Sequence, residues 1–235
     1  MDVVPVHYLT AYAFCPRKLL LKHLSKEKPD TSKVSSKVRK DILRMLNREE
    51  PEIVKNMESV LPLPEVIERY KQHYSKKTRE LIEANKENMK EQESVPGFIK
   101  GVWPRIMREA EQRAEHLFEV MEKTGLSGEV LWNSLIPKLR TDVLVEGLGM
   151  RGMIDLVKEY PGEDIPYVFT AKKPPKYGVW ESDKLKAGAY ILIMQAQGLK
   201  VEEARIVYLA DKEDAEREVP MNGFLKERIL KTRDA

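Results

Sequence analysis

The sequence is poor in cysteine, with Cys15 as the one thiol in 235 residues. A single cysteine excludes an internal disulfide framework. Long apolar runs are also lacking, and none approaches the roughly 20 residues that a membrane-spanning helix needs. No signal peptide is visible at the N-terminus. These absences predict a soluble, cytoplasmic protein with no membrane partner.

Charged residues are abundant instead, at 34%, beside 42% hydrophobic residues, which is enough for a core. The net charge of +3 is unevenly spread along the chain. Residues 1–45 hold ten Lys or Arg against four Asp or Glu, and residues 170–200 hold six against two. Such basic segments are typical of a phosphate-binding surface, although solvated helix faces have the same composition.

Apolar residues recur at helical spacing through most of the first half of the chain. The pattern predicts helices over residues 7–24, around 38–46, from 64 to about 91 and from about 99 to 123. Pro16 is expected to break the first of these near Cys15, and Pro104 to mark the start of the last. Residues 1–125 are therefore predicted to form a mainly helical region, with its N-terminal segment partly packed on a core formed by residues 126–235.

The pattern changes after residue 125, where β-branched and aromatic runs are separated by turn signals. Helices are expected at 180–197 and 223–231. Strands are expected at 129–132, 136–146, 148–158, 165–172, 204–209 and 216–219. This order predicts an α+β or α/β fold, with a mixed sheet crossed by a helix and preceded by a large helical region.

Two of the predicted strands carry a charged residue among apolar neighbours, Asp155 in the first and Lys172 at the end of the next. A buried carboxylate is costly unless it has a partner or a chemical role. An acidic residue on one strand and a lysine on its neighbour form the skeleton of a metal-dependent phosphodiesterase site. The alternative is that Lys172 is a plain ion-pair partner of Asp155.

Four motifs together resemble those of the CRISPR-associated RecB-like nucleases. The segment Tyr12-Ala-Phe-Cys15-Pro16-Arg17-Lys18 resembles their Tyr-x-x-Cys-Pro-Arg-Lys opening, and Gly152-Met-Ile-Asp155-Leu-Val157 resembles their Gly-x-Ile-Asp-Leu-Val strand. Val168-Phe-Thr-Ala-Lys172 stands at the place of their Val-Glu-x-Lys strand, and Lys186-x-x-x-Tyr190 at that of their Gln-x-x-x-Tyr helix motif. The order and spacing of the motifs agree with those of the family across residues 120–210.

The resemblance implies a restriction-endonuclease-like PD-(D/E)XK core, dependence on Mg²⁺ or Mn²⁺, and exonuclease-type cleavage of DNA. In that chemistry the metal polarises the phosphate and acidifies its water. Carried onto this sequence, Asp155 is the first metal ligand and Lys172 the catalytic lysine. His116 is a candidate for the family's upstream metal-ligating histidine. CRISPR adaptation proteins are the partners that the resemblance adds to DNA.

The sequence departs from the family pattern at three places. Thr170 stands where the second metal-binding carboxylate belongs, with Asp164 and Glu181 as alternative carboxylates nearby. Lys186 replaces the glutamine of the helix motif. Family members also carry further cysteines for a 4Fe–4S cluster, which needs four thiolates, so no iron–sulfur cluster is expected from Cys15 alone. Cleavage is therefore expected to be weak and favoured by Mn²⁺.

Basic residues around these motifs predict the DNA-binding surface. With the helix-motif tyrosine, the predicted contacts are Lys173, Lys176, Lys184, Lys186, Tyr190, Arg17 and Lys18. Trp180 lies beside them as a candidate base-stacking residue, whereas Trp103 and Trp132 are more typical of core positions. His73 has no companion at metal-ligand spacing and is expected to be an ordinary surface or core residue.

Three functions remain open at this point. The chain is a divergent metal-dependent nuclease whose missing carboxylate comes from elsewhere, or an inactive relative that binds DNA or serves as a CRISPR-adaptation scaffold. The third alternative is an unrelated interaction protein built of helices and a sheet. The sequence does not indicate the oligomeric state.

Overall fold

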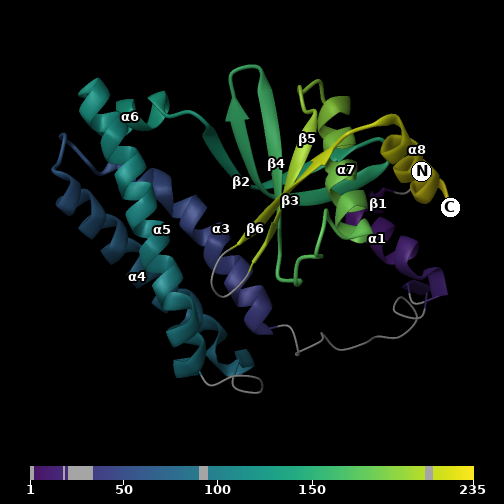
Figure 1. The fold of residues 1–235 in the computed structure, drawn as a ribbon, viewed down its shortest axis with the longest axis horizontal. Helices are drawn as coiled ribbons and strands as arrows, with labels where there is room; N and C mark the ends of the chain where they lie inside the picture. The colour runs from purple at the N-terminus through teal and green to yellow at the C-terminus, as the bar shows by residue number, and fades with distance from the viewer. Residues whose placement is uncertain (1–2, 18, 21–33, 90–94, 210–213) are drawn as a thin grey trace. The chain divides into compact units, whose positions relative to one another are not determined.

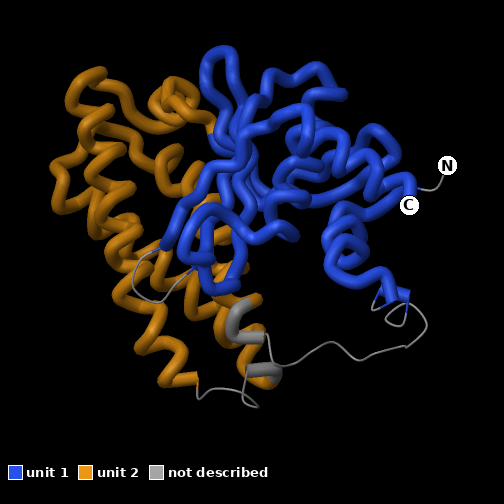
Figure 2. Tube along the Cα trace, turned by 45° about the vertical axis from the view of Figure 1, so that its right-hand side comes forward, with its two compact units in different colours: residues 1–29, 139–235 blue, residues 30–138 orange. Residues whose placement is uncertain are grey.

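The computed structural model describes residues 3–17, 19–20, 34–89, 95–209 and 214–235 (Figure 1). The chain forms two compact units (Figure 2). Unit 1 comprises residues 1–29 and 139–235 and contains the sheet, and unit 2 comprises residues 30–138 and is helical. Helices and a mixed sheet occur together, which confirms the predicted α+β class.

Unit 2 is built from α3 (Val34–Lys55), α4 (Leu63–Met89), α5 (Val95–Thr124) and α6 (Gly128–Ser134). The helix α4 packs along both α3 and α5, and α6 packs against α3. Apolar side chains three or four positions apart form the buried stripe of α5, namely Phe98, Val102, Ile106, Ala110, Ala114, Leu117 and Met121. This spacing places one face of the helix in the core of the bundle.

A partly buried arginine joins the three long helices of unit 2. The Arg113 guanidinium of α5 donates to Glu50 Oε2 at 2.5 Å, to Asn47 Oδ1 at 2.8 Å and to Glu109 Oε1 at 2.8 Å. It also lies 5.9 Å from the centre of the Tyr74 ring on α4. Burial lowers the pKa of Arg113, but the neighbouring carboxylates outweigh burial and raise that pKa well above its ordinary value. The cation is thus compensated inside the helical unit.

The strands of unit 1 form a mixed sheet. The strands are β1 (Val4–Pro5), β2 (Lys138–Gly147), β3 (Met150–Tyr160), β4 (Glu163–Thr170), β5 (Glu203–Tyr208) and β6 (Ala215–Pro220). Their order is β1-β3-β4-β5-β6, with β2 also paired to β3. The neighbours β3 and β4 are antiparallel, β4 and β5 are parallel, and β5 and β6 are antiparallel.

The parallel pair β4 and β5 requires a crossover, and α7 (Glu181–Ala196) supplies it. This helix contacts β3, β4, β5 and β6, and both α1 (Val6–Phe14) and α8 (Gly223–Asp234) pack against it. Ten of its residues are buried, including every position from Ala187 to Met194. A helix that is apolar nearly all round is buried on most sides. Consequently α7 forms the centre of the core of unit 1 (Figure 1).

Most of the predicted elements are present, with corrections at three places. Residues 129–132 were expected to be a strand but belong to the helix α6, where Leu131 is buried and Glu129 lies near Lys55 of α3. The helix α5 begins at Val95 and contains Pro104, because its apolar stripe continues through the proline. The two-residue strand β1 was not predicted.

The N-terminal segment belongs to the sheet unit. The helix α1 ends at Phe14 and Cys15 is its C-cap, so the expected break before Pro16 is confirmed. Val6 and Leu9 of α1 lie in the same core as α7, and residues 1–29 therefore form part of unit 1. The boundary on the other side of the helical unit falls after residue 138, where the predicted boundary was after residue 125. Residues 21–24 of the predicted first helix lie outside the described residues.

None of the described helices combines the length and apolar character needed to cross a membrane.

Gly152 on β3 leaves room for an aromatic ring. A Cβ at this position would lie 2.6 Å from Tyr190 Cε1 and 3.2 Å from Val6 Cβ. The Tyr190 hydroxyl of α7 donates to the Met153 carbonyl at 2.8 Å, so the ring is fixed against the strand. Tyr190 thus holds α7 to the strand that carries Asp155.

Replacement of Gly152 by alanine should destabilise unit 1 by about 1–3 kcal/mol, because the added methyl group overpacks a fixed ring. Urea unfolding followed by Trp180 fluorescence, in a background with Trp103 and Trp132 replaced by phenylalanine, measures this unit separately. Gly223→Ala is the matched control, since no atom lies within 4 Å of the added Cβ. Equal stability of the two variants would contradict the described packing.

Candidate functional site

Asp155 lies where the pairing of β3 with β4 gives way to a side-chain contact. The paired residues run from Tyr160 opposite Glu163 to Leu156 opposite Tyr167. Beyond that point the Phe169 N–H donates to Asp155 Oδ2 at 2.8 Å. Asp155 is 1% exposed, so this charge-assisted hydrogen bond helps to offset the cost of its burial. Its carboxylate is thereby positioned beside the C-terminal end of β4.

Thr170 is the last residue of β4, and its polar groups are used in the turn that follows. Its carbonyl accepts from the Leu209 N–H at 2.8 Å, and its Oγ1 accepts from the Lys172 N–H at 3.4 Å. The hydroxyl therefore supports the backbone that presents Lys172. It brings no negative charge to the end of the strand.

Lys172 pairs with a carboxylate on the crossover helix. Its Nζ forms an ion pair with Asp183 Oδ1 and donates to Ser182 Oγ at 2.9 Å. Asp183 lies in the first turn of α7, where the positive end of the helix dipole favours a carboxylate. Asp183 is 5% exposed, whereas the Lys172 side chain is half-exposed. The pair thus places a cation at the surface above a buried anion.

Tyr208 completes the surroundings of Asp183 from β5. Its hydroxyl donates to Asp183 Oδ2 at 3.2 Å and accepts from the Trp180 N–H at 3.1 Å. Burial, together with the neighbouring Asp183 charge, raises the pKa of Tyr208 to about 12. The phenol therefore keeps its proton at neutral pH and remains a donor to the carboxylate. Both oxygens of Asp183 are engaged, one by Lys172 and the other by Tyr208.

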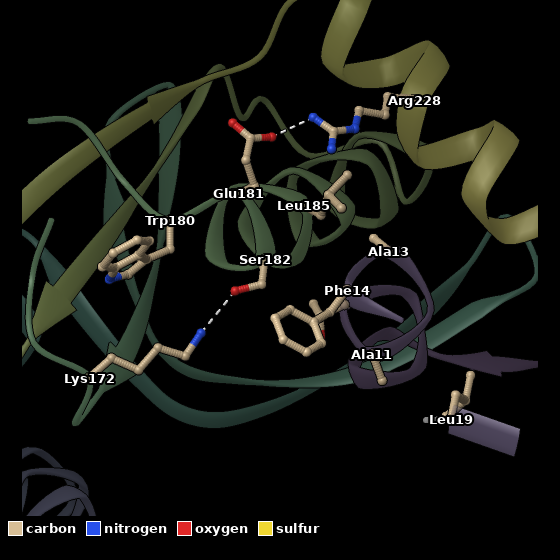
Figure 3. Close-up of a pocket in the computed structure, with 11 residues that line it drawn as sticks. Ala11, Ala13, Phe14, Leu19, Lys172, Trp180, Glu181, Ser182, Leu185 and Arg228 are labelled. Atoms are coloured by element: carbon tan, nitrogen blue, oxygen red, sulfur yellow. Dashed lines mark hydrogen bonds and ion pairs between the residues drawn. The ribbon is translucent and has the colours of Figure 1, made fainter. Parts of the chain in front are cut away.

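A pocket of about 610 Å³ opens beside Lys172 within unit 1 (Figure 3). Phe14 and Leu19 line it from the N-terminal segment, and Trp180, Ser182 and Leu185 line it from α7 and its N-cap. At the far side Arg228 of α8 forms an ion pair with Glu181. The pocket combines apolar and aromatic walls with two cationic side chains, as ligand sites commonly do.

The predicted basic residues occupy two different settings. Lys173 and Lys176 are exposed in the segment after β4, and Lys176 Nζ lies 5.2 Å from the centre of the Tyr177 ring. Lys184 and Lys186 are partly buried on α7, where Lys186 Nζ lies 5.8 Å from the Tyr190 ring centre. Arg17 is exposed, and Lys18 lies outside the described residues.

Tyr190 is buried and so does not belong to the predicted DNA-binding surface. Its side chain is buried against Gly152, and its hydroxyl is bonded to the Met153 carbonyl. A ring in that position stabilises β3 and does not present its face to a ligand. The packing therefore indicates that Tyr190 supports the strand.

The sequence also predicts His116, Asp164 and Glu181 as possible metal ligands. His116 is exposed on α5 and belongs to unit 2. Asp164 lies at the start of β4, opposite Glu159, and so at the other end of the strand from Thr170. Glu181 lines the pocket but pairs with Arg228. The buried Asp183 is the carboxylate that contacts Lys172.

Among the described residues, one group of three metal-ligating side chains is close enough to share an ion, and it lies in unit 2. Glu49 and Glu52 of α3 meet His73 of α4, with His73 Nε2 3.1 Å from Glu49 Oε2. The carboxylate neighbours of His73 are distant in sequence, so no metal-ligand spacing along the chain marks them. The Lys77 ammonium also lies 3.2 Å from the same Glu49 oxygen and supplies a positive charge there. Burial raises the pKa of Glu49, but hydrogen bonds from His73 and Lys77 outweigh burial and lower it.

Sequence reasoning missed Asp183 and Tyr208 as members of the site. Asp183 stands one helical turn before Lys186, at a position that has no counterpart in the family motifs. The available signal was a pair of acidic residues, Glu181 and Asp183, in the first turn of a helix whose later residues are apolar. Tyr208 offered no signal, because a tyrosine at the end of a strand is ordinary.

The Lys172–Asp183 pair can be tested by a double-mutant cycle. Lys172→Met should destabilise unit 1 by about 1–3 kcal/mol, because it removes one partner of a buried carboxylate. Adding Asp183→Asn should recover part of that loss, giving a coupling energy of about 1–2 kcal/mol in urea unfolding. The cycle with Asp155→Asn is the control and should show a smaller coupling. The opposite ranking would mean that Lys172 pairs with Asp155.

Comparisons with known proteins add little to this site. No family model and no curated protein matches the sequence. One solved structure, described as the crystal structure of SSO0001, is 15% identical over 84% of this chain and 84% of its own, with a TM-score of 0.31. A TM-score this low does not establish a shared fold. The candidate site therefore rests on the geometry of this chain.

Proposed function

We propose that this chain is a nuclease-fold protein of the CRISPR-associated RecB-like kind, which binds DNA in the cytoplasm and cleaves it weakly with a divalent metal. One observation supports this proposal above the others. The buried carboxylate of Asp155, the threonine in the family's carboxylate position and Lys172 all gather at the C-terminal end of β4. This is the order of groups in the motif that the sequence resembles.

The donor set is compatible with a hard divalent cation. Mg²⁺ takes oxygen ligands, commonly one or two carboxylates completed by water and substrate phosphates. Asp155 would hold the metal, whereas both oxygens of the buried Asp183 are engaged by Lys172 and Tyr208. When bound, the metal would polarise the scissile phosphate and acidify the attacking water.

The remaining groups have roles that do not depend on the metal. The Lys172 ammonium donates hydrogen bonds from Nζ and would offset charge that develops on the phosphate. Asp183 and Ser182 hold that ammonium in place, and Tyr208 fixes Asp183 in turn. The exposed Lys173 and Lys176 extend the positive charge along the segment after β4 and would bind the DNA backbone.

Two features of the same site explain why cleavage is proposed to be weak. Thr170 contributes a neutral hydroxyl where a second charged ligand would bind the metal more tightly. Lys172 is already paired with Asp183. Its ammonium must leave that carboxylate, or bind it and the phosphate together, before it can stabilise charge on the phosphate.

Binding without cleavage is the second candidate, and the Lys172–Asp183 pair is the observation that favours it. A relative that has lost a metal-binding carboxylate can keep a lysine by pairing it with another acid. Such a protein would retain its basic surface and act as a DNA-binding or CRISPR-adaptation scaffold protein.

Thr170→Glu should raise cleavage of end-labelled DNA by at least about tenfold in Mg²⁺ or Mn²⁺, because it adds a charged ligand beside Asp155. Single- and double-stranded substrates are assayed in parallel. Asp155→Ala is the control and should abolish cleavage in both backgrounds. Cleavage that survives Asp155→Ala would contradict the proposed site, and its absence from the native protein and Thr170→Glu alike would leave the scaffold role.

Lys173→Glu and Lys176→Glu should each weaken DNA binding and lower the slope of log affinity against log salt by about 1, because each removes a cation that binds phosphate. Fluorescence anisotropy at several salt concentrations measures the slope. The control is Lys200→Glu, an exposed lysine whose carbonyl accepts from the Asp164 N–H at the opposite end of β4. An equal loss in the control would locate the binding surface elsewhere.

A further inference from the structure

The pocket beside Lys172 has two exposed aromatic side chains among its walls. Phe14, the last residue of α1, is 77% exposed, and Trp180, the N-cap of α7, is 46% exposed. Leaving such rings in water forgoes burial of large apolar surfaces. Both line one pocket of about 610 Å³, within the range of roughly 300–1,000 Å³ that is typical of small-ligand sites.

The orientation of Trp180 is fixed by hydrogen bonds at both ends of the residue. Its indole Nε1–H donates to the Lys173 carbonyl at 2.8 Å, and its backbone N–H donates to the Tyr208 hydroxyl at 3.1 Å. A ring held in this way loses little conformational freedom when a ligand stacks on it. The same indole contact ties the exposed ring to the basic segment after β4.

The charged groups around the rings suit an anion. The Lys172 ammonium lies on one side of the pocket, and the Arg228 guanidinium lies on another (Figure 3). Arg228 is paired with Glu181 near the surface, where the side chains are 41% and 61% exposed. Surface pairs of this kind contribute little, so the guanidinium can exchange its partner for a phosphate at small cost.

We propose that this pocket binds one unpaired nucleotide of a DNA strand, whose base stacks on Phe14 and Trp180 while its phosphate contacts Lys172 or Arg228. The proposal rests on the proposed DNA partner and deepens it. Base stacking on aromatic side chains requires the open face of a base, which a paired and stacked duplex does not offer. The pocket would thus select a single strand or a frayed end and hold it beside Lys172.

Binding of a fluorescein-labelled ten-nucleotide oligothymidine, measured by anisotropy without metal, tests the pocket. Phe14→Ala and Trp180→Ala should each weaken binding by about tenfold, and they should change the affinity for a blunt hairpin duplex less than twofold. Phe14→Leu should be as weak as Phe14→Ala, whereas Phe14→Tyr should retain the native affinity, because a stacking face is what counts. Tyr160→Ala removes an exposed ring at the β3–β4 turn and is the matched control.

Unchanged oligothymidine affinity in Phe14→Ala and Trp180→Ala would overturn this inference, as would equal losses for the oligothymidine and the duplex. These outcomes are separate from those for the proposed nuclease. Cleavage that depends on Asp155 but not on Phe14 would support the proposed nuclease activity and contradict nucleotide binding in the pocket. If oligothymidine binding depends on Phe14 and Trp180 but the protein does not cleave DNA, the pocket proposal is supported and the nuclease activity is contradicted.

Discussion

The ion pair between Lys172 and Asp183 is the interaction on which the site depends. It joins the segment after β4 to the first turn of α7, and Tyr208 of β5 binds the same carboxylate. Three consecutive elements of the crossover thus meet at one buried anion. An uncompensated charge there would be costly, so the lysine, the acid and the phenol stabilise one another's positions.

This arrangement connects the packing of unit 1 to its proposed chemistry. The helix α7 must cross the sheet because β4 and β5 are parallel, and its N-terminus therefore comes to the end of β4 where Thr170 and Lys172 lie. Tyr190, further along the same helix, packs against Gly152 and thereby holds the strand that carries Asp155. One helix positions both charged groups, while Trp180 at its start provides a wall of the pocket.

Much of the fold could be predicted because it depends on local patterns. The apolar spacing of α4 and α7 and the β-branched runs of β3 to β5 gave those elements to within a few residues. The strand expected at residues 129–132 failed because four residues carry too little periodicity to separate a strand from a helix, and packing of Leu131 decided the outcome. Pro104 misled the prediction of α5 because burial of the stripe around it outweighed the missing hydrogen bond.

The site was less predictable than the fold. Asp155 and Lys172 stood out as charges on apolar strands, but their partners did not, since Phe169 contributes a backbone N–H and Asp183 is eleven residues from Lys172. Contacts between distant residues are set by the crossover and not by spacing along the chain. Glu49 and His73 likewise belong to different helices, so their spacing along the chain does not mark them as neighbours.

A metal site at Asp155 is best tested by titrating the protein with Mn²⁺ and following the free ion by electron paramagnetic resonance. Every protein carries Glu52→Gln, which removes a carboxylate from the group in unit 2. We expect the parent to bind Mn²⁺ weakly, Thr170→Glu to bind it more tightly, and Asp155→Asn to lose that binding. Equal Mn²⁺ affinity in all three proteins would contradict a metal site at the end of β4.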